Sequence, residues 1–209
     1  MAKPRTPIVS IDLECTGLIP GWNEIFEIAF IKLDKEFTPT NEMFHSFVRV
    51  EHPERFTEEA QDITGKTIDE IMTYPEIELV KEELEEWIKR ATPTGYIRPL
   101  GQFYDGYDRN FLKLFLNKEV DHTDKNGNPI TTTVYDKHIT RVTMDLKHSA
   151  IDYDNWISYN RIPYKKIGEY SLKDIADYCQ VENPKAHSAL HDARTTAICY
   201  KKLLGIKRY

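Results

Sequence analysis

The sequence predicts an α/β fold in which a mixed β-sheet is flanked by helices. Three β-rich segments come first and at short intervals, and helical segments then alternate with single strands. No internal repeat or low-complexity segment interrupts this order. The succession is typical of a domain that combines antiparallel and parallel strands in one sheet. A chain of 209 residues that is 40% hydrophobic can close a sizeable core, so we expect residues 1–209 to form a single domain.

An antiparallel meander is expected at the start of the chain. Residues 7–14, 23–34 and 43–51 are rich in β-branched and aromatic side chains and lie close together in the sequence. Residues 57–91 then become helical. An apolar stripe at helical spacing marks the helix face expected to pack on the sheet. Its members are Ile77, Val80, Leu84, Trp87 and Ile88.

The middle of the chain combines a strand and a helix with an excursion from the core. Residues 95–105 predict a strand that runs into a helix at residues 106–116. The polar segment that follows carries an Asn-Gly pair between β-forming residues, which is a hairpin signal. We therefore expect a β-hairpin insertion at about residues 117–139 and a return to the sheet edge at residues 139–146.

The last third of the chain is predicted to be mostly helical. Helices are expected at residues 146–160, 171–179 and 188–205. Ser171 is the expected N-cap of the second helix because its hydroxyl can accept a hydrogen bond from the first turn. Gly205 is expected to end the third helix.

The charge balance argues against a module held on nucleic acid mainly by phosphate neutralisation. The chain has 28 Lys and Arg against 34 Asp and Glu, a net charge of −6 with neutral histidines. A basic clamp would need the opposite balance. An enzyme whose acidic residues gather metal ions is compatible with this composition.

The composition predicts a cytoplasmic protein that does not contact a membrane. No stretch approaches the roughly 20 apolar residues of a membrane helix, and no secretory signal is visible at the start. The three cysteines, Cys15, Cys179 and Cys199, form no CxxC pair and cannot all pair with one another. This usage favours a reducing compartment.

Two acids stand in the first predicted strand. Asp12 and Glu14 are two residues apart, so a strand directs both carboxylates to the same face. Like charges in a partly buried site are costly unless a cation lies between them. Taken alone, the spacing is compatible with a metal site and with an exposed pair on the surface. The following Thr16-Gly17 indicates a sharp turn that lets another group approach closely.

Two further acids lie near expected helix starts. Asp108 opens a helix, and Asp192 lies early in the last helix, after His187 and His191. Each acid alone is equally explained by the helix macrodipole, which favours acids in the first turn. Asp105 competes with Asp108 for a role in the site and is otherwise interpreted as a helix N-cap.

Taken together, these segments resemble the DEDDh 3′-to-5′ exonuclease family, the ribonuclease T and proofreading-exonuclease-like group with a ribonuclease H-like fold. IVSIDLECTGL resembles the family's D-x-E-x-T-G motif, GYDRNFL its F-D-x-x-F-L motif, and AHSALHDARTTA its H-x-x-x-x-D motif. The segment AQDITGKT is similar to a further family motif, with Lys66 in place of the usual Ile. The resemblance covers nearly the whole chain except the insertion. One departure is the stretch GQFYDGYD, where the family commonly has Asn or His-Asn.

The resemblance implies a single exonuclease domain that hydrolyses the phosphodiester bond at a 3′ end and releases nucleoside 5′-monophosphates. The metal ligands that it implies are Asp12, Glu14, Asp108 and Asp192. Two divalent cations, Mg²⁺ or Mn²⁺, suit an all-carboxylate set and would lower the pKa of the attacking water. The spacing to Asp192 makes His187, and not His191, the implied general base, since an imidazole titrates near neutrality.

The resemblance also implies a pocket for the terminal nucleotide. Thr16, Gly17 and Leu18 would contact it, with Leu18 against a base face, while core packing is the alternative for Leu18. Tyr107 is a candidate for stacking on an unpaired base, although aromatic side chains beside a strand are also typical of a core.

Several functional assignments stay open at this point. The implied substrates are the 3′ ends of single-stranded DNA or RNA, with DNA favoured, and a polymerase or another replication or repair protein is a candidate partner. The alternative function is a catalytically idle nucleic-acid-binding or polymerase-associated module of the same fold.

Overall fold

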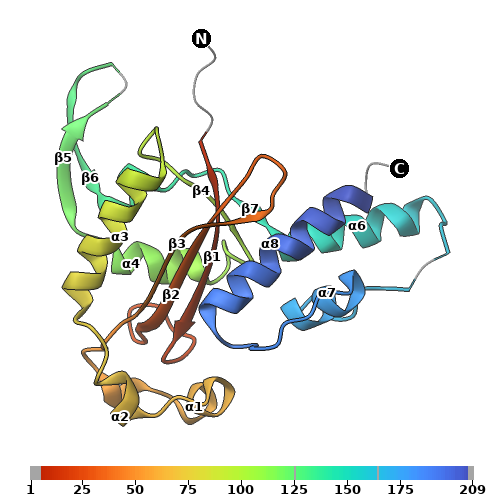
Figure 1. Cartoon of the computed structure of the whole chain (residues 1–209), viewed down its shortest axis with the longest axis horizontal. Helices are drawn as coiled ribbons and strands as arrows, with labels where there is room; N and C mark the ends of the chain where they lie inside the picture. Colours follow the sequence, from red (N-terminus) through yellow and green to blue (C-terminus); the bar gives the residue numbers. More distant parts are fainter. Residues whose placement is uncertain (1–5, 125, 164, 207–209) are drawn as a thin grey trace.

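A computed structural model describes residues 6–124, 126–163 and 165–206. A five-stranded sheet lies at its centre in the order β3-β2-β1-β4-β7 (Figure 1). The strands are β1 (Ile8–Cys15), β2 (Ile25–Leu33), β3 (Pro39–Phe47), β4 (Arg98–Gly101) and β7 (Met144–Asp145). The first three strands pair antiparallel, whereas β4 and β7 run parallel to β1. The predicted meander and the mixed sheet are both confirmed.

The third strand lies earlier in the chain than predicted. The sequence indicated residues 43–51, but β3 covers Pro39–Phe47, and Val48 and Val50 are buried beyond its end. An edge strand tolerates a proline and exposed polar side chains. The start of β3 is polar, so a search for apolar residues did not predict it.

The sheet carries a separate apolar cluster on each face. One cluster joins β1 and β2 to α3 (Ile77–Ala91) and α4 (Asp108–Phe115). The other joins β2 and β4 to α6 (Leu146–Tyr159), α7 (Leu172–Cys179) and α8 (Ala189–Ile206) (Figure 1). Strand β1 alternates between the two faces, as a period of two requires. Its residues Val9, Ile11 and Leu13 belong to the first cluster.

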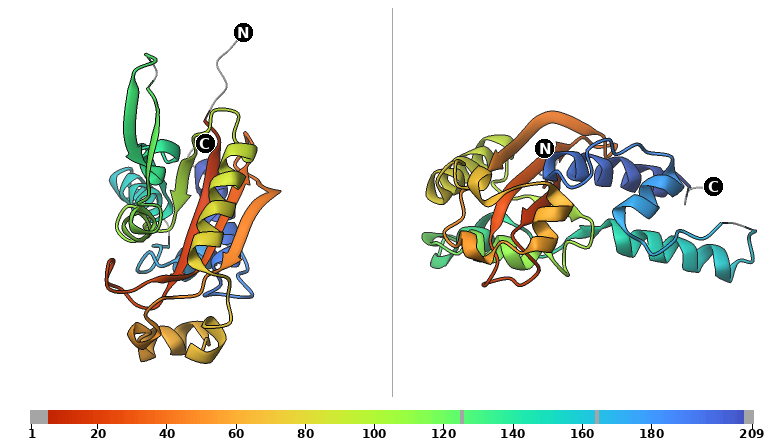
Figure 2. Two further views of the ribbon diagram at one scale, coloured as in Figure 1. Left: turned by 90° about the vertical axis from the view of Figure 1, so that its left-hand side faces the viewer. Right: turned by 90° about the horizontal axis from the view of Figure 1, so that it is seen from below.

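The long helical stretch predicted at residues 57–91 is broken into three helices. They are α1 (Glu58–Thr64), α2 (Ile68–Ile71) and α3. Gly65 ends α1 with a left-handed φ of 68°, and the side chain of Thr67 caps α2. The short helices α1 and α2 lie together at one end of the sheet (Figure 2). The predicted stripe of α3 is confirmed, with Val80, Leu84, Trp87 and Ile88 buried.

The predicted insertion contains a hairpin. Strands β5 (Glu119–Thr123) and β6 (Pro129–Thr133) form a two-stranded sheet of their own, which projects from the five-stranded sheet (Figures 1 and 2). Gly127 adopts a φ of 86° in the connecting turn, as the hairpin signal requires. The sequence did not predict that the insertion continues into a short helix, α5 (Val134–His138), which Thr133 caps.

The C-terminal helices agree closely with the prediction. Ser171 caps α7 and forms a capping box with Asp174. Gly205 does not end α8, which continues to Ile206; a glycine inside the last turn weakens a helix without stopping it. Within the described residues, no helix has the length and apolar character needed to cross a membrane.

Candidate active site

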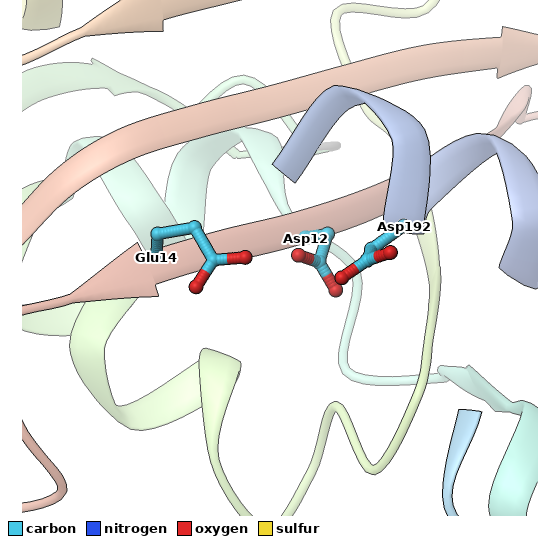
Figure 3. Close-up of side chains that lie close together, drawn as sticks. All are labelled: Asp12, Glu14 and Asp192. Carbon is cyan, nitrogen blue, oxygen red and sulfur yellow. The ribbon is translucent and has the colours of Figure 1, made fainter. Parts of the chain in front are cut away.

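Three acids from two distant parts of the sequence meet at one end of β1. Asp12 and Glu14 project from β1, and Asp192 approaches them from the first turns of α8 (Figure 3). One carboxylate oxygen from each lies within 4.8 Å of those of the other two. Helix α8 is fixed against the strand because Ser10 Oγ donates a hydrogen bond of 2.7 Å to the carbonyl of Ala193. The same-face prediction for Asp12 and Glu14 is therefore confirmed.

Asp108 lies beside this group but outside the 4.8 Å cluster. It is the first residue of α4, it is buried, and its charge acts on Asp12 and Glu14. Asp105, its rival in the sequence, instead forms an ion pair with Arg109 at 2.9 Å. The N-cap interpretation of Asp105 was wrong, because Tyr107 occupies the position before the helix and no side chain caps it.

Burial and mutual repulsion make the ionised site unfavourable in the absence of cations. Burial raises the pKa of Asp12 well above its ordinary value, and the charges of Asp108 and Glu14 raise it further. Burial and the neighbouring acids raise the pKa of Glu14 to about 8. Burial also raises the pKa of Asp108 to about 8, although backbone hydrogen bonds oppose this effect. A site built from carboxylates alone fits a hard divalent cation, which would remove the repulsion.

These pKa values predict that the metal-free protein becomes less stable as the pH rises. Between the ordinary pKa values near 4 and about 8, the folded state binds more protons at Glu14 and Asp108 than the unfolded state, so the free energy of unfolding falls across this window. In EDTA, we expect thermal unfolding to show a loss of more than about 1 kcal/mol between about pH 5 and about pH 8. Saturating Mg²⁺ should reduce the loss, whereas a flat profile in EDTA would contradict the prediction.

Asp192 ties the turn that contains His187 to the acid cluster. Its Oδ2 accepts a hydrogen bond of 3.0 Å from the backbone N–H of His187, and its Oδ1 accepts one of 2.5 Å from Asn183. His187 has a φ of 63°, a left-handed conformation that is uncommon for a side chain of this size. His191 lies within α8, and its Nδ1 is 3.3 Å from Ser188 Oγ.

A pocket of about 260 Å³ opens beside the acids. Five of the predicted site residues line it: Glu14, Gly17, Leu18, Tyr107 and His187. Leu18 is 71% exposed, so the core-packing alternative for this residue is wrong. The hydroxyl of Tyr107 donates to the carbonyl of Gly17 at 2.9 Å and so joins two walls of the pocket.

Helix α1 supplies a pocket wall that the sequence did not predict. Ala60, Ile63 and Thr64 line the pocket opposite the loop that carries Leu18. Ile63 is 48% exposed although it is a large apolar residue. Its place in the AQDITG segment, which already resembled a family motif, was the available signal.

Thr16 does not line the pocket. Its side chain is fully buried, and its hydroxyl accepts a hydrogen bond of 3.0 Å from the N–H of Glu24. Its carbonyl accepts from Thr57. The structure therefore assigns Thr16 to holding the loop together, and not to the pocket surface where it was expected.

The close approach predicted at Gly17 involves a buried amide. A Cβ atom at this position would lie 2.6 Å from Asn23 Nδ2, and the Asn23 side chain is held by Ile19 and Arg55. We expect Gly17→Ala to lower the free energy of unfolding by about 1–3 kcal/mol, as overpacking does. Gly205→Ala is the control: no atom outside its helix lies within 4 Å, so it should stabilise the protein by about 0.5–1 kcal/mol. Urea unfolding measures both, and equal stability of Gly17→Ala and the parent would contradict the prediction.

The mixed sheet and the three clustered carboxylates agree with the ribonuclease H-like exonuclease class that the sequence resembles. A family model described as exonuclease (RNase_T) matches residues 9–200. The chain therefore belongs to this exonuclease family.

One curated relative and two solved structures are similar to this chain. The PolC-type DNA polymerase III of Staphylococcus aureus is 26% identical over 204 residues, which are 97% of this chain but only 12% of the polymerase. A solved structure of exonuclease I superimposes with a TM-score of 0.72 at 17% identity, covering 97% of this chain and 41% of that one. Cell-death related nuclease 4 gives 0.65 at 14% identity, covering 97% and 65%. The predicted ribonuclease H-like fold is confirmed.

Proposed function

We propose that this chain is a 3′-to-5′ exonuclease that hydrolyses phosphodiester bonds at the 3′ end of single-stranded nucleic acid and releases nucleoside 5′-monophosphates. One observation carries the proposal: a pocket of about 260 Å³ that His187 lines adjoins the carboxylate cluster and shares Glu14 with it. A terminus bound in this pocket would place its first phosphodiester bond beside the acids. The proposal treats residues 1–209 as a single exonuclease domain.

The acids are proposed as the ligands of two divalent cations, Mg²⁺ or Mn²⁺. The ligands are Asp12, Glu14, Asp108 and Asp192. The raised pKa values of Asp12 and Glu14 support this role, because they reflect burial and repulsion among neighbouring acids, which a bound cation would offset. When bound, such ions lower the pKa of water and neutralise charge that develops on the phosphoryl and leaving oxygens.

His187 is proposed as the general base. His187 and Glu14 both line the pocket, and the backbone N–H of His187 donates a hydrogen bond to Asp192. The imidazole would take a proton from the attacking water, which imidazole can do at neutral pH. The left-handed φ of 63° supports a functional role, because such backbone conformations tend to occur at active sites.

The terminal nucleotide is proposed to lie between Leu18, Ile63 and Tyr107. Leu18 and Ile63 offer exposed apolar surface to a base, and an unpaired terminus enters a small pocket without the energy needed to separate a duplex. DNA is favoured over RNA, since exonuclease I has been solved in complex with a dT13 oligonucleotide. The PolC-type relative favours a polymerase as partner. We also propose a cytoplasmic location.

Digestion of labelled oligonucleotides tests the proposal. A single-stranded DNA with a label at its 5′ end should give a ladder of successively shorter labelled products in Mg²⁺ or Mn²⁺, and EDTA should stop the reaction. The same strand with a label at its 3′ end should release labelled mononucleotide first. Release of mononucleotide from the 5′ end would contradict the proposed direction.

The alternative, an idle nucleic-acid-binding module, predicts a different outcome. Such a module would bind the oligonucleotide in Ca²⁺ and still leave it intact in Mg²⁺ and Mn²⁺. Matched DNA and RNA strands in the same assay determine the sugar preference, and faster digestion of the RNA would overturn the preference proposed above.

A further inference from the structure

A fifth acid lies behind the proposed active site. Glu27 is on β2, directly opposite Glu14 in the pairing of β1 with β2. Its side chain is only 2% exposed. It is absent from the group of carboxylates whose oxygens lie within 4.8 Å of one another. A buried carboxylate needs hydrogen-bonding partners. The groups that contact Glu27 therefore indicate its role in the structure.

Two side chains hold the same oxygen of Glu27. Ser188 Oγ donates to Glu27 Oε1 at 3.1 Å, and His45 Nε2 lies 2.9 Å from this atom. The contact from Ser188 joins residues 161 positions apart in the sequence. Glu27 is thus a fixed point on the sheet to which the start of α8 is attached.

Ser188 stands between the proposed base and the proposed metal ligand on α8. It directly follows His187, and its carbonyl accepts hydrogen bonds from the N–H groups of His191 and Asp192. The N–H of His187 in turn donates to Asp192. A displacement of Ser188 would therefore also move His187 and Asp192.

We propose that Glu27 is a positioning residue that holds His187 over the pocket through its contact with Ser188. The proposal rests on the proposed function of His187. His187 has a left-handed φ of 63°, which few residues other than glycine adopt, and contacts from outside the turn help to hold such a conformation. The Glu27–Ser188 contact is the long-range side-chain hydrogen bond that reaches this turn from the sheet.

The test compares two serines that both attach α8 to the sheet. Ser188→Ala removes the donor to Glu27, and Ser188→Thr keeps a hydroxyl. Ser10→Ala is the matched control, because Ser10 is buried and bonds to Ala193, on the other side of Asp192 from His187. Each variant is assayed for kcat, KM and Mn²⁺ dependence on single-stranded DNA, and the amide exchange of His187 is followed by NMR.

We expect Ser188→Ala to lower kcat by about tenfold or more, with KM and the Mn²⁺ midpoint within about threefold of the parent. Exchange of the His187 amide should become at least about fivefold faster. Ser188→Thr should recover most of kcat, and Ser10→Ala, which removes a contact beside Asp192 and not one at the His187 turn, should leave His187 exchange near the parent value.

The partner variant Glu27→Leu gives an independent check. If Glu27 and Ser188 act through one contact, the double variant with Ser188→Ala should be no worse than the poorer single variant. Unchanged kcat and unchanged His187 exchange in Ser188→Ala would overturn the proposal. If the parent has no nuclease activity, the proposed function fails, and the exchange of the His187 amide alone decides whether Glu27 positions the turn.

Discussion

Asp12→Asn should reduce nucleotide release by about a thousandfold or more at saturating Mg²⁺ or Mn²⁺. Asp12 lies between Glu14 and Asp192 (Figure 3), and the ligand atoms of the three acids are within 4.8 Å of one another. Asparagine preserves the shape of the side chain but removes the charge that would hold a cation. Initial rates with a labelled single-stranded oligonucleotide measure the loss.

A control variant and a stability measurement distinguish a loss of catalysis in Asp12→Asn from a loss of folded structure. Asp105→Asn removes a nearby acid that pairs with Arg109 outside the cluster, and we expect it to keep activity within about threefold, as for most changes of exposed ion pairs. In EDTA at about pH 8, Asp12→Asn should be at least as stable as the parent, because it removes one of the repelling carboxylates. Activity of Asp12→Asn near that of the parent would contradict the proposed site.

His187→Ala should reduce kcat by about 10²- to 10⁴-fold, the usual contribution of a general base. His191→Ala should reduce it by less than about fivefold, since His191 is absent from the pocket wall. Single-turnover rates on the same oligonucleotide compare the two variants. Added imidazole should partly restore His187→Ala if the missing group transfers a proton.

The comparison of the two histidines can contradict the assignment of His187 as the general base. A larger loss of kcat for His191→Ala than for His187→Ala would show that His187 is not the general base. Equal, small losses of the single-turnover rate would show that proton transfer does not limit the rate of either variant. Substrate affinity, measured by oligonucleotide binding in Ca²⁺, should differ little among the parent and the two variants.

The part of the site that follows a regular period could be predicted from the sequence. Asp12 and Glu14 share a face because a strand repeats every two residues, and the structure confirms this. Asp108 was preferred to Asp105 because of the spacing to the following Phe-Leu pair, and only Asp108 faces the cluster. The chemical roles of these residues, and of His187, stay predictions.

Tertiary contacts explain what the sequence left out. Ile63 becomes a pocket wall only because α1 folds opposite the loop that carries Leu18. The side chain of Thr16 turns inward because Glu24 offers it a backbone N–H. Glu27 was visible as a lone acid in an apolar strand, but its link to Ser188 depends on how α8 crosses the sheet.

The alternation of β1 has a consequence for how this chain can fold and change. Its odd positions, such as Ile11 and Leu13, build the core, while its even positions carry Asp12 and Glu14. A slip of one residue in pairing would exchange the two sets and push both carboxylates into the apolar layer. The charges of Asp12 and Glu14, which the site requires, therefore also raise the free energy of a chain in which β1 pairs out of register. A deletion of one residue within the strand would destroy fold and site in a single step, so insertions and deletions are expected to accumulate in surface segments such as the β5–β6 hairpin.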